Sequence, residues 1–194
     1  MGLILYLRRV APPGARRAVW LAALALLAAG ASLGVVAHGF ALAPATVDAL
    51  WQPLYLALGG SVALFVVGAI ADWKGPGAAR LALPIMLVVA GGFYFATRWT
   101  GGDFRVFVAY EAAALLGALA VYATLHFRRG FPGAGAIALA FALSLAAGVV
   151  QAGGRAAIDI GWPLDHNGIF HLIQLVGLAV LGRGLGRALR EPSP

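Results

Sequence analysis

The chain has 194 residues, of which 62% are hydrophobic and only 11% are charged, and it contains no cysteine. Its apolar runs of about 20 residues can cross about 30 Å of hydrocarbon, so the sequence predicts an all-α polytopic membrane bundle without a soluble domain. The lack of cysteine excludes disulfides, thiolate nucleophiles and cysteine-ligated metal sites. The net charge of +7 comes largely from arginines in short loops and near the termini. This pattern indicates membrane topology and excludes a nucleic-acid-binding patch.

The predicted elements begin with a basic cytoplasmic segment over residues 1–17. A single transmembrane domain over residues 18–189 follows, and a short tail ends the chain at residues 190–194. The first apolar run is too long for the core of a cleaved signal peptide, so we expect an uncleaved anchor. Charged residues, proline and glycine divide the domain into six spans, at about 18–41, 51–72, 79–98, 104–127, 131–152 and 167–189.

The positive charges predict the orientation of these spans. Eleven of the fourteen lysines and arginines fall on the side that holds both termini, and only Arg98, Arg105 and Arg155 fall on the other. Cytoplasmic loops carry the excess of lysine and arginine in membrane proteins. Both termini are therefore predicted to be cytoplasmic, in a plasma membrane of bacterial type.

Most polar side chains of the spans fall in the outer half of this topology. Two of the four histidines lie in the segment Asp165–Gln174, which opens the last span. The other outer polar positions lie near span ends or within two turns of one: His38, Asp48, Tyr110, Glu111 and Gln151. Ionisable groups are costly in a bilayer, so their convergence predicts a functional site.

The last span carries a polar stripe. Asn167, His171 and Gln174 are spaced i, i+4 and i+7, so they share one helix face, which we expect to point into the bundle. His166 lies about 140° from His171 around a regular helix. Both rings can therefore meet at one point only if the helix begins after His166, with Asp165 or Asn167 as its N-cap.

These residue types favour a zinc site. Zinc with three protein ligands and one open position activates water for hydrolysis. The candidate ligands are His38, His171 and either His166 or Asp48. Asp48 could instead serve as a general base, and Glu111 is a second candidate base.

Each of these residues also has a structural alternative. A histidine at a helix end often lies at the membrane interface or forms an ordinary hydrogen bond. Asp48 could be an acid at a helix N-terminus, where the helix dipole favours it. Glu111 could hold helices together by pairing with Arg98 or Arg105.

The same residues resemble a superfamily of membrane proteins that includes the alkaline ceramidases and the adiponectin and progestin receptors. Its members carry a histidine at the end of one helix, an aspartate about ten residues later, and a His-x-x-x-His pair that opens the last helix. His38 and Asp48 match the first two features, and Asn167–His171 matches the third with asparagine in place of the first histidine. Phe170 supplies the aromatic residue that precedes the second histidine.

The resemblance implies a zinc site with His38 and His171 as ligands and Asp48 beside the metal-bound water. For a ceramidase it also implies hydrolysis of the amide bond of a long-chain lipid. The superfamily has seven spans, and the resemblance implies that the six spans expected here correspond to the last six of them. Gly34 stands where the ceramidases have serine, with Ser32 close by.

The sequence thus predicts a zinc-dependent membrane hydrolase of a lipid amide or ester, whose substrate enters laterally from the outer leaflet. Around the site we expect supporting polar residues, namely Asn167, Gln174, Gln151, Tyr110 and Ser32. The alternative is a non-enzymatic lipid sensor or assembly subunit with a buried polar network. A transporter is a third possibility, although the chain shows no inverted repeat.

Overall fold

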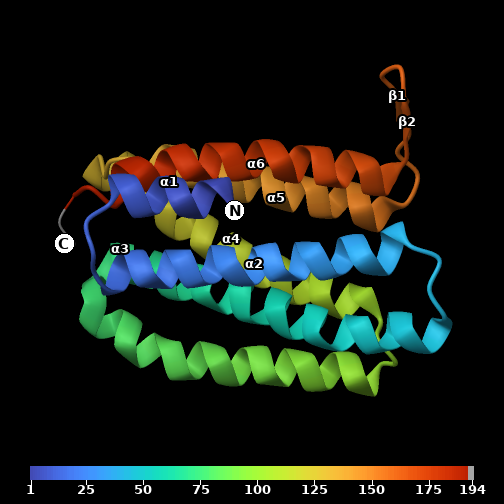
Figure 1. Ribbon diagram of the computed structural model, residues 1–194. Helices are drawn as coiled ribbons and strands as arrows, with labels where there is room; N and C mark the ends of the chain where they lie inside the picture. The colour runs from blue at the N-terminus through green and yellow to red at the C-terminus, as the bar shows by residue number, and fades with distance from the viewer. Residues whose placement is uncertain (192–194) are drawn as a thin grey trace.

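A computed structural model describes residues 1–191 and shows an almost entirely helical protein (Figure 1). Residues 192–194 of the predicted tail lie outside the described part. Five helices, α2 to α6, are long and apolar enough to cross a membrane, which indicates a multi-pass membrane protein. In chain order the elements are α1 (Gly2–Val10), α2 (Ala15–Gly39), α3 (Pro44–Trp99), α4 (Phe104–Arg129), α5 (Ala134–Gly153), β1 (Ile158–Asp159), β2 (Pro163–Leu164) and α6 (His166–Ala188).

Helix α3 covers two of the predicted spans. Its 56 residues would extend about 84 Å as a straight helix, far more than a bilayer requires. The helix instead turns back at Gly75, where φ is 83° and ψ is 177° (Figure 1). This backbone conformation is essentially restricted to glycine. The arms before and after the bend pack closely, because a methyl group at Gly59 would lie only 2.8 Å from the ring of Phe93.

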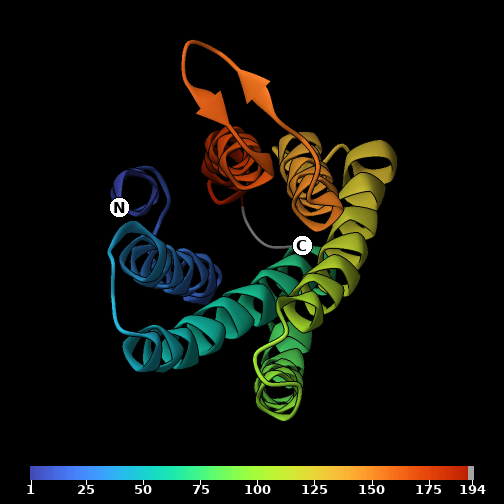
Figure 2. The same ribbon diagram turned by 90° about the vertical axis from the view of Figure 1, so that its right-hand side faces the viewer.

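The long helices pack in the order of the chain. Each of α2, α3, α4 and α5 packs along its successor, whereas α2 and α6 do not pack along one another (Figure 2). Between α2 and α6 lies α1, which contacts both. We call the end with the β1–β2 hairpin the hairpin end, and the end with Gly75 the bend end (Figure 1).

The main core is aromatic and lies toward the bend end. Trp20 and Tyr122 are fully buried. The ring of Trp20 lies 5.8 Å from that of Phe65, and the ring of Tyr122 lies 5.8 Å from that of Phe141, centroid to centroid. Contacts of Trp20 with Tyr122 at 6.5 Å and of Phe65 with Phe141 at 6.0 Å link these two pairs. The four rings therefore fix α2, α3, α4 and α5 relative to one another at this depth.

The sequence analysis placed no helix in the basic N-terminal segment, but the structure has α1 there. Its nine residues are too few to match a membrane span, so the search for long apolar runs missed it. Leu7 is fully buried. Two glycines of α6 allow α1 to pack closely against it. A methyl group at Gly182 would overlap Leu3, and one at Gly186 would overlap Tyr6.

Candidate functional site

A polar ladder joins α5 and α6 at the hairpin end. Ser144 Oγ donates a hydrogen bond of 2.9 Å to Gln174 Oε1, and Gln151 Nε2 donates one of 3.3 Å to Asn167 Oδ1. These four residues are the polar ladder below. The Oε1 atom of Gln151 is buried and accepts no hydrogen bond from the rest of residues 1–191. The ladder therefore leaves one buried acceptor without a hydrogen bond.

His171 lies on the ladder face of α6, between Asn167 and Gln174 in the predicted stripe. The residue is exposed, and its ring meets Phe170 edge-on at a centroid distance of 4.9 Å. On α5, Gly148 lies between the two rungs of the ladder, at the level of His171. A methyl group built at Gly148 would have no neighbour within 4 Å, so space is open beside the imidazole.

His38 reaches the same end of the molecule from α2. It is exposed in the last turn of that helix, and its ring stands edge-on to Trp51 at 5.4 Å between centroids. The structure thus places at one end of the molecule two histidines that are far apart in the sequence.

His166 points elsewhere. Helix α6 begins at His166, and its N-cap is Asp165, whose carboxylate accepts a 2.9 Å hydrogen bond from the backbone N–H of Gly168. That hydrogen bond lowers the pKa of the Asp165 carboxyl. Because His166 already belongs to the helix, it lies about 140° around α6 from His171. The rings of His166 and His171 could converge only if the helix began after His166, but α6 begins at His166.

Asp48 is exposed near the start of α3, which begins at Pro44, earlier than predicted. The carboxylate of Asp48 makes no hydrogen bond or ion pair within residues 1–191. Across this part of the chain, no group of three or more histidine, aspartate or glutamate side chains is placed to hold a metal ion. The arrangement does not present the three-ligand set that zinc requires, and zinc binding stays a prediction.

Tyr110 and Glu111 have different surroundings. The hydroxyl of Tyr110 donates a 3.0 Å hydrogen bond to the carbonyl of Gly59, and its ring stacks on Phe93 at 4.7 Å. Tyr110 therefore fixes α4 against both arms of α3. Glu111 is half-buried on the α4 face that also carries the buried Phe107.

The expected partners of Glu111 are not its partners in the structure. Arg105 pairs with Asp103 at 2.8 Å, and the ion pairs found among residues 1–191 do not include Glu111 or Arg98. The Arg105 guanidinium lowers the pKa of the Asp103 carboxyl, mainly through its hydrogen bonds. Glu111 is thus a carboxyl with no partner in the described part of the chain.

A groove of about 620 Å³ lies between α1, α2 and α6. Its lining is apolar apart from Ser32, Arg183 and the hydroxyl of Tyr6. Ser32 donates a 2.9 Å hydrogen bond to the carbonyl of Ala28 within its own helix. Ser32 and Leu178 mark the edge of the groove nearest the hairpin end. At 1.5 Å per residue, His38 and His171 lie about 9–11 Å beyond that edge.

The sequence analysis missed a buried charge network at the bend end. The second predicted span ends at Asp72, and no partner was predicted for this residue, but Asp72 is fully buried. Its carboxylate accepts hydrogen bonds from Arg16 Nε and, at 2.5 Å, from the hydroxyl of Tyr122. Arg16 also donates a 2.9 Å bond to the carbonyl of Glu191. An acidic residue between Ala71 and Trp73, at the end of an apolar run, was the available signal.

The sequence model of a family of unknown function (DUF6962) matches residues 1–190 of the chain. The chain belongs to this family. The match includes every helix, and with them the groove and the polar ladder. No curated protein and no solved structure matches the chain.

Proposed function

We propose that this member of DUF6962 crosses the membrane six times, with both termini in the cytoplasm. The two arms of α3, residues 44–74 and 76–99, are each long enough to cross the hydrocarbon layer. Eleven of the fourteen lysines and arginines lie toward the bend end of the molecule. The positive-inside rule requires such an excess on a cytoplasmic face.

The absence of cysteine allows a direct test of this topology. Single cysteines at Lys74 and Asp159 should report opposite sides of the membrane. A membrane-impermeant maleimide should label the Asp159→Cys variant in intact cells, and the Lys74→Cys variant only after the cells are opened. The reverse pattern, or labelling of both variants in intact cells, would refute the proposed orientation.

Within this topology, we propose that the chain binds a single-chain amphiphilic lipid between α2 and α6. The observation that carries this proposal is the apolar groove between α1, α2 and α6. It lies between helices that do not pack along one another, so a lipid can reach it sideways from the bilayer. From Leu24 to His38, α2 offers about 21 Å, a length suited to a long acyl chain.

The lipid head would lie at the hairpin end, beside His38, His171 and the polar ladder. Gln151 Oε1 lacks a donor among residues 1–191, so a hydroxyl or amide N–H of the lipid head would satisfy it. The open space beside Gly148 gives such a group room. These features favour a head that carries both an acceptor carbonyl and a donor.

We propose that the chemistry at this place is hydrolysis of the lipid's amide or ester bond. His38 and His171 are kept as the proposed zinc ligands, so a carboxylate would take a proton from the attacking water. The free amide hydrogens of Asn167 would stabilise the negative charge that develops on the carbonyl oxygen. Asp48 and Glu111 remain the candidate carboxylate bases.

Zinc is the cofactor proposed for this reaction, and its presence can be measured directly. His38 and His171 would hold the ion, and zinc held there would supply a Lewis acid. We expect about one zinc per purified chain, with His38→Ala and His171→Ala each removing it along with activity on a ceramide or a monoglyceride. His126→Ala is the matched control, because His126 lies in the last turn of α4, at the bend end. This variant should keep both the zinc and the activity. Stoichiometric zinc that survives both of the first two changes would refute this site.

A lipid sensor without catalysis is the second candidate. It is favoured because the ladder residues pair with one another, as in a structural network, and do not converge on one point. Metal-free protein that binds a monoglyceride without cleaving it, and whose thermal stability is unchanged by chelator, would favour the sensor over the hydrolase.

A further inference from the structure

We propose that the β1–β2 hairpin anchors the protein in the interfacial layer of the membrane, with one apolar face inserted among the lipid head groups. The occupant of this face is the bilayer itself, not another protein. The inference rests on the helices crossing the membrane. It is independent of whether the groove binds or cleaves a lipid.

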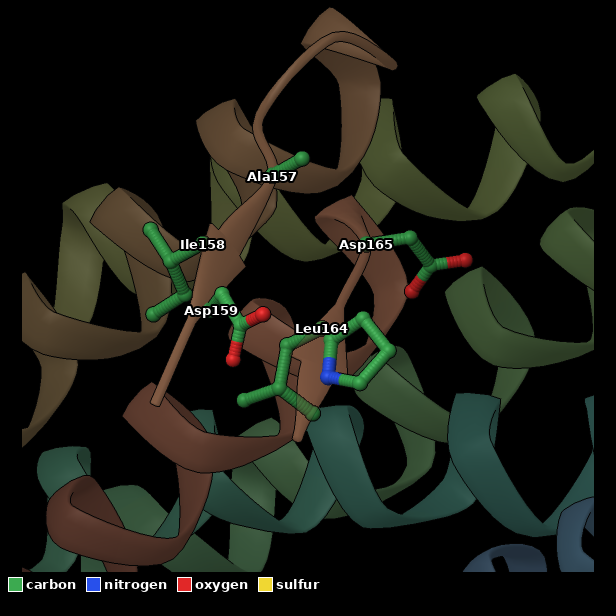
Figure 3. Close-up of a pocket in the computed structure, with 6 residues that line it drawn as sticks. Ala157, Ile158, Asp159, Leu164 and Asp165 are labelled. Carbon is green, nitrogen blue, oxygen red and sulfur yellow. The ribbon is translucent and has the colours of Figure 1, made fainter. Parts of the chain in front are cut away.

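The hairpin is amphipathic. Its strands pair antiparallel, with Ile158 opposite Leu164 and Asp159 opposite Pro163. Since side chains alternate across a strand, Ile158 and Leu164 share one face, and Asp159 belongs to the other. Figure 3 shows Ile158 and Asp159 leaving β1 in different directions. Asp159 also accepts a 2.8 Å hydrogen bond from the backbone N–H of Gly161, which fixes the turn.

Apolar side chains on the hairpin are unusually exposed. The exposed fractions are 44% for Ile158, 64% for Ile160 and 73% for Trp162. Ile160 and Trp162 lie outside the pocket at the base of the hairpin, which is lined by residues 157–159 and 163–165 (Figure 3). A two-stranded hairpin alone is at best marginally stable in water, so this one needs a surface to rest on.

The direction of the hairpin identifies that surface. Figures 1 and 2 show it projecting sideways from the end of the bundle and past α6, across the direction of the long helices. In a protein whose helices cross the membrane, the bundle axis follows the membrane normal. The hairpin therefore runs along the membrane surface.

The residue types also match the interface between lipid and water. Tryptophan is enriched there because its ring is apolar and its indole N–H is polar. Arg155, exposed just before the hairpin, suits the depth of the lipid phosphates. Asp159 would face the water from the opposite face of the hairpin.

Nitroxide labels on single cysteines in the otherwise cysteine-free chain test the proposal. The Ile160→Cys and Asp159→Cys variants are labelled and reconstituted in nanodiscs of phosphatidylcholine. Collision with oxygen, which concentrates in lipid, is compared with collision with a water-soluble nickel chelate. We expect the oxygen-to-nickel ratio to be several-fold higher at residue 160 than at residue 159.

A label at Val149, exposed on α5, is the control for lipid contact and should give the highest ratio. Equal nickel accessibility at residues 159 and 160 would mean that the hairpin stands in water, and would overturn the proposal. A label at residue 160 that is shielded from both reagents, in nanodiscs and in detergent, would indicate a protein partner or a second copy and would also overturn it. Nickel access at Val149 would instead refute the membrane-spanning architecture.

Discussion

At the scale of single residues, the buried carboxylate of Asp72 is a costly arrangement that needs compensation. A charged group removed from water is tolerated only when paired and hydrogen-bonded. Arg16 supplies the opposite charge, and the hydroxyl of Tyr122 donates to the second oxygen. The network connects α2, α3 and α4 at the point where α3 reverses, so it contributes to the position of the bend.

Removing one partner of this pair should be much worse than removing both. We expect Asp72→Leu to lower the free energy of unfolding by about 3–5 kcal/mol, because it leaves the Arg16 guanidinium buried without its counter-charge. Adding Arg16→Met to that variant should restore most of the loss. Chemical unfolding in detergent micelles measures both. A double variant as unstable as Asp72→Leu alone would show that the ion pair is not what stabilises this end.

Residue spacing predicted the polar stripe of α6 at the hairpin end, but it did not predict the buried pair of Arg16 and Asp72 at the bend end. The period of Asn167, His171 and Gln174 follows from helix geometry alone, and the structure shows the two amides hydrogen-bonded across to α5. The pairing of Arg16 with Asp72 joins residues 56 positions apart. No local pattern specifies such a contact. The direction of His166 depended on one residue of helix start, which spacing leaves open.

At the scale of elements, the bend of α3 depends on one backbone conformation. Glycine lacks the Cβ atom that would clash at a φ of 83°. The two arms can pack against each other only because the chain reverses there. Charge and breaker residues located this turn in the sequence, but they could not show that the helix continues almost directly from one arm into the next.

Alanine substitutions on either side of Pro76 should separate strain from helix propensity. We expect Gly75→Ala to lower the free energy of unfolding by about 1–3 kcal/mol, the usual range for a residue held in a disfavoured region. Gly77→Ala should be neutral or stabilising by up to about 1 kcal/mol, because Gly77 is helical and has open space around it. Thermal unfolding followed by circular dichroism tests the pair. Equal effects of the two changes would mean that the bend does not require glycine.

The short helix α1 shows why length alone is a limited guide to membrane elements. Its nine residues fell below the threshold for a span, and its arginines marked it as a loop. The contact of α1 with α6 depends on Gly182 and Gly186, which have no side chain to block it. The sequence does not show that these glycines are packing positions until their partner helix is known.

At the scale of the whole molecule, the incomplete packing between α2 and α6 is the feature with the clearest functional meaning. Five long helices pack in sequence order, and α1 fills only part of the remaining gap. The sequence analysis predicted that a lipid enters laterally from the outer leaflet, and this entry remains a proposal. The groove gives it a location, an apolar lining and a direction toward His38 and His171.

Photocrosslinking of a lipid in the groove tests the central claim most directly. A long-chain monoglyceride with a photoreactive diazirine at the end of its acyl chain is added to the protein in phosphatidylcholine nanodiscs, and crosslinked peptides are mapped by mass spectrometry. We predict crosslinks at residues that line the groove, namely Leu24, Leu27, Ala28, Leu178, Ala179 and Gly182. Ala28→Trp, which fills the groove, should remove most of them, and Ala29→Trp, on the neighbouring exposed position of α2, should not. Crosslinks spread evenly over the lipid-facing helices, or unchanged by Ala28→Trp, would contradict the account.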